Sequence, residues 1–102
     1  MPYVYILRCA DSSYYTGSTL NLEQRLATHQ LGIGANYTAK RLPVELAWCS
    51  EFERVDEAFS WEKRIQGWNR AKKELLIAGK YEELPGWSVR ERAKSQLQGD
   101  GN

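Results

Sequence analysis

The apolar positions of the first twenty residues follow the pattern of a β-hairpin. Residues 3–9 combine β-branched and aromatic types in a run too short for a helix, so this stretch predicts a strand. Residues 10–13 (Ala-Asp-Ser-Ser) have turn composition, because Asp and Ser side chains bond nearby backbone donors. Residues 14–19 then predict the returning strand.

Helical signals begin after this hairpin. Asn21 is a good helix cap, and Gln24 is placed to complete a capping box. The predicted helix runs to about Leu31, and Gly32 ends it. Residues 32–42 predict a loop.

The remaining pattern adds one strand and two helices. The third strand covers residues 44–52, after Pro43, and the helices run from Asp56 to about Trp68 and, capped by Asn69, over residues 70–78. The element order ββαβαα predicts an α+β fold with a small three-stranded antiparallel sheet flanked by helices.

The C-terminal end carries a further capping box. Ser88 with Glu91 predicts a short helix to about Gln98, and residues 99–102 are expected to fray. The chain has 102 residues, close to the commonest domain size, with no internal repeat or low-complexity linker. We therefore expect one domain over residues 1–98.

Composition excludes several classes of protein. With 42% hydrophobic and 12% aromatic residues, the chain resembles a globular domain rather than a disordered one. No apolar stretch is long enough to span a bilayer, and no export signal precedes the first strand. Cys9 and Cys49 cannot form a disulfide framework, so we expect a cytoplasmic protein with buried thiols and no membrane association.

The net charge of +1 does not by itself suggest a nucleic-acid partner. Its distribution is uneven, because residues 62–80 hold six basic residues against two acidic ones. This stretch is either a solvated helical surface or a surface that attracts phosphates.

Residue counts remove most familiar active sites. One His and two widely spaced Cys do not match a zinc site, and no Walker-type loop is present. Gly32-Ile33-Gly34 lacks the preceding strand of a dinucleotide fingerprint. A hydrolase triad would have to use His29, but no Ser lies in a glycine-flanked elbow.

Tyrosines are concentrated near the N-terminus. Tyr3 and Tyr5 share one face of the first strand, because side chains alternate along a strand. Aromatic packing across a hairpin is the ordinary explanation for any one of these tyrosines. A phenol with a pKa near 10 is a poor base unless neighbouring cations lower that pKa.

Arg25 and His29 lie four residues apart and hence side by side on the first helix. Leu22 and Leu26 mark the buried stripe of that helix, and Arg25 adjoins both, so its guanidinium is predicted at the edge of the core. This is either an ordinary boundary position or, with His29, a phosphate clamp, because guanidinium forms a bidentate fork with phosphate oxygens.

Glu62 falls within an apolar stripe on the following long helix. The stripe consists of Val55, Ala58, Phe59, Trp61 and Ile65. A carboxylate on a buried face costs free energy unless it is paired or binds a metal. Glu62 therefore either pairs with Arg25 or holds a cation at the rim of a site.

Together these residues resemble a known family. Tyr3-Val4-Tyr5 and, about ten residues later, Tyr15-Thr16-Gly17 are similar to the paired signature of the GIY-YIG nuclease superfamily, in particular its short single-domain bacterial branch, related to the catalytic subunit of branched-DNA resolvases. Arg25, His29 and Glu62 follow in the family's order. Tyr3 stands where the family name has Gly and Thr16 where it has Ile, but neither position is expected to do chemistry.

The resemblance implies a metal-dependent endonuclease that hydrolyses phosphodiester bonds in DNA. Its expected substrates are branched, flapped or nicked DNA rather than plain duplex, with a role in repair or recombination and a protein partner for targeting. The alternative is a non-catalytic nucleic-acid-binding domain on the same scaffold. That all five family positions are filled favours the enzyme.

The resemblance also implies residue roles. Tyr5 would be the general base, with its pKa lowered by a bound cation and by Arg25. Tyr15 would position the water or the scissile phosphate, and Arg25 would stabilise the developing negative charge. His29 would hold Tyr5 or the phosphate, or relay a proton. Glu62 would be the sole protein ligand of one Mg²⁺ or Mn²⁺ ion.

Further residues are expected to contact DNA. Gly17 would let the backbone approach closely where the second strand ends. The others are Tyr37, Lys40, Arg41, Lys63, Arg70, Lys72 and Lys73. Such phosphate-directed binding should weaken steeply with salt.

Overall fold

The computed structural model describes residues 1–81 and residue 84. The chain divides into two compact units, residues 1–68 and residues 69–102. The helix expected from Ser88 to Gln98 and the tail over residues 99–102 lie outside the described residues. The single domain expected over residues 1–98 stays a prediction.

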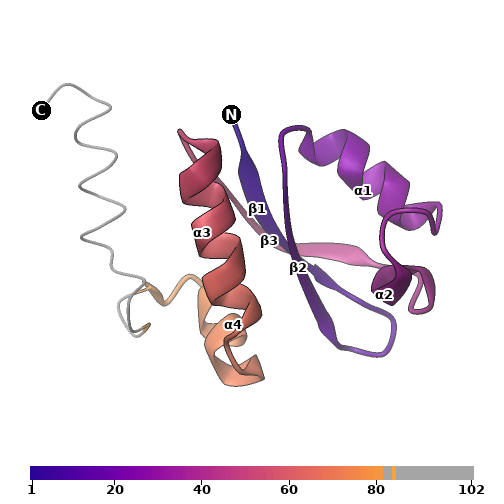
Figure 1. The fold of residues 1–102 in the computed structure, drawn as a ribbon. Helices are drawn as coiled ribbons and strands as arrows, with labels where there is room; N and C mark the ends of the chain where they lie inside the picture. The colour runs from indigo at the N-terminus through magenta and orange to yellow at the C-terminus, as the bar shows by residue number, and fades with distance from the viewer. Residues whose placement is uncertain (82–83, 85–102) are drawn as a thin grey trace, which may run out of the picture. The chain divides into compact units, whose positions relative to one another are not determined.

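The first unit contains the predicted three-stranded antiparallel sheet. Its strands are β1 (Tyr3–Arg8), β2 (Tyr14–Thr19) and β3 (Glu45–Glu51), in the order β2-β1-β3 (Figure 1). Tyr5 at the centre of β1 lies opposite Gly17 of β2 and Cys49 of β3. Because no other described strand pairs with the outer edge of β2, this edge is available to form part of a site.

Four helices complete the described elements. They are α1 (Leu22–Gln30), α2 (Asn36–Ala39), α3 (Val55–Gln66) and α4 (Arg70–Ile77), of which α4 belongs to the second unit. The sequence predicted only a loop over residues 32–42, so the helix α2 was not predicted. Four residues are too few to show a helical period, which explains why the pattern missed this turn.

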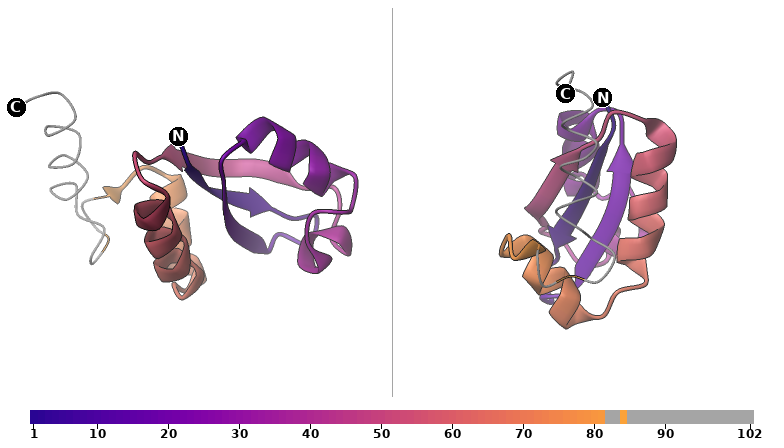
Figure 2. Two further views of the ribbon diagram at one scale, coloured as in Figure 1. Left: turned by 45° about the horizontal axis from the view of Figure 1, so that its top comes forward. Right: turned by 90° about the vertical axis from the view of Figure 1, so that its left-hand side faces the viewer.

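The two faces of the sheet are covered by different helices. Figures 1 and 2 show the sheet between α1 and α3. On the α1 face, Tyr5 and Leu7 pack with Leu22 and Leu26. The other face presents Val4 and Ile6 towards α3, whose buried residues are Ala58, Trp61 and Ile65.

The buried face of α3 is narrower than the sequence predicted. Val55 is 61% exposed and Phe59 is 53% exposed, so these two residues do not belong to the core. The helix begins at Val55 rather than after an Asp56 cap, and Arg54 at the N-cap makes no side-chain capping bond. Asp56 forms an ion pair with Arg54 instead, at 3.0 Å.

The structure bears on two predictions, the burial of the two thiols and the absence of membrane association. Cys9 is buried, whereas Cys49 on β3 is exposed, so the prediction of two buried thiols was wrong for Cys49. Among the described residues, no helix has the length and apolar character needed to cross a membrane.

The Asn21 cap of α1 gives a test of the local folding signal. The Asn21 side chain accepts a hydrogen bond from the Gln24 backbone N–H at 3.0 Å. We expect Asn21→Ala to lower the free energy of unfolding by about 1 kcal/mol in urea denaturation, because it leaves that N–H without its partner. Arg54→Ala is the matched control, because Arg54 stands at the N-cap of α3 with no side-chain capping bond and its ion pair with Asp56 is exposed. Equal losses from both variants would contradict the capping role.

Candidate active site

A buried chain of hydrogen bonds runs from the sheet through α1 into α2. The Tyr5 hydroxyl lies 3.0 Å from His29 Nε2, and His29 Nδ1 lies 2.9 Å from Thr38 Oγ1. The Thr38 hydroxyl donates to the Ala35 carbonyl at 3.1 Å. Tyr5, His29 and Thr38 are each at most 1% exposed, so this chain is built into the interior.

Two glycines make room for this chain. A Cβ on Gly17 would lie 2.5 Å from the Tyr5 hydroxyl oxygen, and a Cβ on Gly34 would lie 2.6 Å from His29 Nδ1. Real side chains do not approach so closely, so the tyrosine ring occupies the space above Gly17 and the imidazole the space beside Gly34. In the structure the Tyr5 ring lies close to the Gly17 backbone, and Gly17 itself is buried. The DNA contact expected at Gly17 stays a prediction.

The surroundings fix the protonation of both rings. Burial raises the pKa of Tyr5 to about 12, with Tyr15 and Glu62 adding to the rise, while the charge and a hydrogen bond of Arg25 oppose it. Arg25 therefore acts on this pKa in the predicted direction, but burial outweighs it; the lowering expected from a bound cation stays a prediction. Burial, assisted by the Arg25 charge, lowers the pKa of His29, so the imidazole is neutral at pH 7.

Arg25 joins this chain to the surface. It is exposed on α1, and its charge and side chain lower the pKa of the buried Tyr5 hydroxyl. A hollow opens beside it, lined by Thr19, Asn21, Gln24, Arg25, Thr28 and Gly34. Because Gly34 touches His29, the hollow adjoins the Tyr5–His29 pair.

Tyr15 lies against His29 on the same face of the sheet. The two rings meet edge to face with centroids 5.3 Å apart. Tyr37 stacks on Tyr15 with centroids 6.1 Å apart and an interplanar angle of 28°. Tyr15 is thus held between His29 of α1 and Tyr37 of α2.

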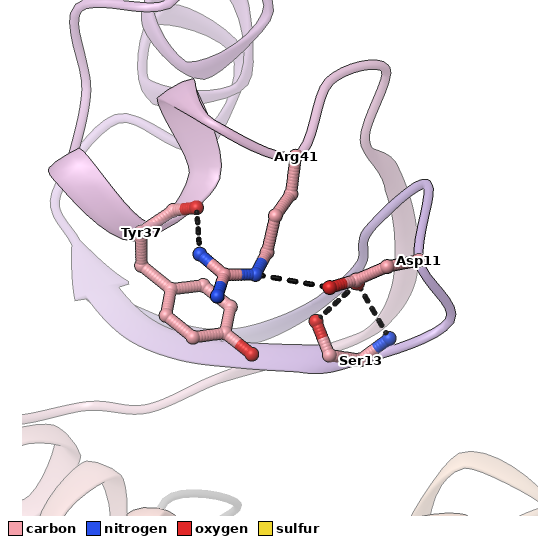
Figure 3. A network of polar contacts seen from close by, with 4 residues as sticks. All are labelled: Asp11, Ser13, Tyr37 and Arg41. Carbon is pink, nitrogen blue, oxygen red and sulfur yellow. Dashed lines mark hydrogen bonds and ion pairs between the residues drawn. The ribbon is translucent and has the colours of Figure 1, made fainter.

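Arg41 fastens Tyr37 to the β1–β2 turn (Figure 3). Its guanidinium carbon lies 3.8 Å from the centroid of the Tyr37 ring, and Nη1 donates to the Tyr37 carbonyl at 3.0 Å. Its Nε pairs with Asp11 at 3.0 Å, and Asp11 also accepts from the Ser13 backbone N–H. Part of the Arg41 charge is therefore already compensated within the protein.

Glu62 approaches the edge strand β2 from the α3 side. Its carboxylate accepts hydrogen bonds from Ser18 at 2.5 Å and from Gln66 at 2.9 Å. Gln66 also donates to the Thr16 carbonyl at 3.2 Å. Between the described residues Glu62 and Arg25 there is no ion pair, so the first of the two sequence interpretations is not realised.

The Glu62 carboxylate fits a divalent cation. Each oxygen accepts one hydrogen bond and keeps further lone-pair capacity, and the side chain is half-buried beside β2. The described residues contain no group of three or more His, Cys, Asp and Glu side chains that could hold a metal ion. A single carboxylate suits Mg²⁺ or Mn²⁺ completed by water and phosphate oxygens.

The structure thus brings four of the five predicted catalytic residues together on the α1 face: Tyr5, Tyr15, Arg25 and His29. Glu62 lies around the edge of β2, near enough for its charge to raise the pKa of Tyr5. Among the described strands none pairs with the outer edge of β2, so the two sets of groups lie on opposite faces beside an edge strand.

The remaining predicted DNA contacts lie in different surroundings. Lys40 and Lys63 are exposed, and Lys63 Nζ lies 5.0 Å from the Phe59 ring centroid. In the second unit, Arg70 pairs with Glu74 at 3.1 Å, and burial lowers the pKa of Lys73. The DNA contacts expected of these residues, and of Tyr37, Arg41 and Lys72, stay predictions.

Several residues of the site were not predicted from the sequence as site residues. They are Thr38 and Gly34, which contact His29, and Ser18 and Gln66, which hold Glu62. None stands in a helical or strand pattern that marks a function. Their roles depend on side-chain contacts made only in the folded chain.

Comparison with known proteins identifies the family of this chain. Residues 1–75 match the family model described as the GIY-YIG catalytic domain. The chain belongs to the GIY-YIG family. This is a nuclease family that acts on DNA and generally uses a divalent metal ion, so the resemblance seen in the sequence is confirmed.

The relatives of this GIY-YIG chain are short UPF0213 proteins. One from Natronomonas pharaonis is 49% identical over 74% of this chain and 89% of its own length. One from Bacillus pumilus is 48% identical over 74% of this chain and 76% of its own. The solution NMR structure of a UPF0213 protein from Bacillus halodurans, 42% identical, matches with a TM-score of 0.52 over 78% of this chain and 86% of that one.

The close contact between Gly17 and Tyr5 gives a packing test. Gly17→Ala forces a Cβ into the Tyr5 ring, so we expect it to lower the free energy of unfolding by about 1–3 kcal/mol in urea denaturation. The matched control is Gly67→Ala, where the nearest atom would be 3.5 Å away. The control should change stability by no more than about 0.5 kcal/mol. A Gly17→Ala protein as stable as the control would contradict the contact.

The raised pKa of Tyr5 gives a pH test. Because the pKa of the Tyr5 phenol is about 12 in the folded protein and 10.0 in its ordinary state, the contribution of this phenol to stability is complete below about pH 10. That contribution should be lost between about pH 10 and 12. We expect the difference in unfolding free energy between the wild type and Tyr5→Phe to shrink over this interval. A difference independent of pH from 9 to 12 would show that Tyr5 is not shifted.

Proposed function

We propose that this protein is a metal-dependent endonuclease that cleaves phosphodiester bonds in branched, flapped or nicked DNA, in repair or recombination. The observation that carries the proposal is the Tyr5–His29 hydrogen bond beside Arg25, with the Glu62 carboxylate around the same strand edge. This set supplies an acceptor for a proton, a cation for the phosphate and a carboxylate for a metal ion.

The first step is the removal of a proton from the attacking water. Tyr5 is protonated at neutral pH and 1% exposed, so it cannot act as a free phenolate. It acts together with His29: the water proton moves to the Tyr5 oxygen while the Tyr5 proton moves to His29 Nε2. The neutral imidazole accepts that proton and becomes an imidazolium, which is fully buried and afterwards returns the proton through the Tyr5 hydroxyl to the leaving oxygen of the DNA.

Arg25 serves the phosphate and the tyrosine at once. Its guanidinium, at the mouth of the polar hollow, lies where a phosphate entering from solvent meets the Tyr5 hydroxyl. Negative charge that gathers on the phosphate oxygens is stabilised there by charge-assisted hydrogen bonds. The half-buried Tyr15, held between His29 and Tyr37, orients the water or the phosphate.

Glu62 would hold the divalent ion at the edge of β2. When bound, Mg²⁺ or Mn²⁺ supplies a positive charge that polarises the phosphate and stabilises the leaving oxygen. Ser18 and Gln66 fix the orientation of the carboxylate, so that its remaining lone pairs point to a constant place.

Substrate choice rests on DNA shape rather than on general attraction. A net charge of +1 gives little non-specific affinity for a plain duplex, and Asp11 compensates part of the Arg41 charge. A DNA strand that is displaced or nicked enters a site at the edge of β2 more readily than a DNA strand held in a duplex. A protein partner would supply further targeting.

The test is a cleavage assay with the purified protein. End-labelled flap, nicked, four-way and plain duplex DNA, and an RNA of the same sequence, are incubated with Mg²⁺, Mn²⁺ or a chelator. We expect metal-dependent cleavage with the branched and nicked DNA ahead of the duplex. Arg25→Ala and Glu62→Gln should each slow cleavage by about a hundred- to a thousandfold, because each removes a group acting on the phosphate.

Matched controls separate the site from general charge. Glu53→Gln and Arg54→Ala remove an exposed carboxylate and an exposed guanidinium outside the site and should cleave at the wild-type rate. Binding without cleavage on every substrate and metal would overturn the enzyme in favour of the non-catalytic binding domain. Cleavage unchanged in Glu62→Gln would remove Glu62 from the mechanism.

A further inference from the structure

The hydrogen bonds around Thr38 favour one assignment of protons. The Ala35 carbonyl can only accept, so its 3.1 Å contact with Thr38 is a hydrogen bond only if the Thr38 hydroxyl donates its single proton there. Thr38 Oγ1 is then an acceptor towards His29, and the proton of that 2.9 Å contact must sit on Nδ1. A neutral imidazole carries one proton, so Nε2 is bare and accepts from Tyr5.

The opposite tautomer is disfavoured by the same contacts. With the proton on Nε2, His29 would donate to Tyr5 and Nδ1 would require the proton of Thr38. The Thr38 oxygen and the Ala35 carbonyl oxygen would then face each other at 3.1 Å with no proton between them. That would bring two oxygens into repulsion beside the buried Thr38 and His29 side chains, and the Ala35 carbonyl would keep only its hydrogen bond from the Ala39 backbone N–H.

We propose that Thr38 is a positioning residue that fixes the tautomer of His29, with the proton on Nδ1 and Nε2 open to the Tyr5 hydroxyl. Its importance for catalysis rests on the proposed nuclease function, because only the bare Nε2 can take the Tyr5 proton when water is deprotonated. The tautomer itself does not depend on that function.

The helix α2 is built to hold Thr38 in this place. The Ala35 carbonyl also accepts the Ala39 backbone N–H at 2.9 Å, so its position is set by the helical turn. The neighbouring Tyr37 stacks on Tyr15, and Arg41 ties that tyrosine to Asp11 (Figure 3). The turn therefore supports both ring contacts of the site.

The experiment measures the tautomer directly by long-range proton–nitrogen NMR of the single histidine, at a pH where the ring is neutral. In the wild type we expect Nδ1 protonated and Nε2 unprotonated. Thr38→Val, which removes the hydroxyl at nearly constant shape, should move the population towards protonated Nε2. Thr38→Ser should restore the wild-type pattern, because it keeps the hydroxyl.

The matched control is Thr16→Val. Thr16 is also buried, at 4% exposure, but its hydroxyl has no hydrogen-bond partner among the described residues, so this variant should leave the His29 spectrum unchanged. On a cleaved DNA substrate, Thr38→Val should lower kcat by about tenfold to a hundredfold with KM unchanged, and Thr38→Ser should recover it.

The NMR result tests the role of Thr38, and the cleavage result tests the proposed nuclease function, so the two failures are distinguishable. A wild-type His29 protonated on Nε2 would overturn the proposal, and so would a Thr38→Val spectrum identical to that of the wild type. If Thr38→Val does not fold, the wild-type and Thr38→Ser spectra still decide which nitrogen carries the proton. Absence of cleavage by the wild type would overturn the proposed function, while the spectra would still support or refute the tautomer assignment.

Discussion

The site depends on the placement of the Tyr5 phenol over Gly17. A buried hydroxyl costs about 1–3 kcal/mol if it lacks a partner, and the Tyr5 hydroxyl has one in its hydrogen bond with His29. The ring in turn fits only because residue 17 has no side chain. Packing and hydrogen bonding therefore impose the same position on Tyr5, and the neighbouring residues of the site are arranged around it.

The site extends from the central strand β1, which carries Tyr5, to the edge strand β2, which carries Tyr15 and Gly17. Helix α1 brings Arg25 and His29 to one face of the sheet, and α3 brings Glu62 to the other. Groups on the two faces come within electrostatic range of each other, because the charge of Glu62 raises the pKa of Tyr5.

The sequence predicted the strands, the long helices and all five family positions, because each rests on local signals: alternation along a strand, a cap at Asn21 or Asn69, four-residue spacing on a helix. It misjudged the surroundings. Val55 and Phe59 were placed in the core because a helical projection shows a stripe but not how wide a face the sheet covers. The pKa of Tyr5 is raised although Arg25 lowers it as predicted, because the cost of burial is not visible in a sequence.

The order of elements and the residue types that can do chemistry were thus determined by the sequence, because hydrophobic period, capping and family signature act over a few neighbouring residues. Only the tertiary structure decided that Thr38 touches His29, that Gly34 makes room for the imidazole and that Glu62 binds Ser18 instead of Arg25. These contacts join segments 9 to 44 residues apart or fill a space of atomic size. They are set by which side chains fit together when the chain closes, and no local pattern contains that information.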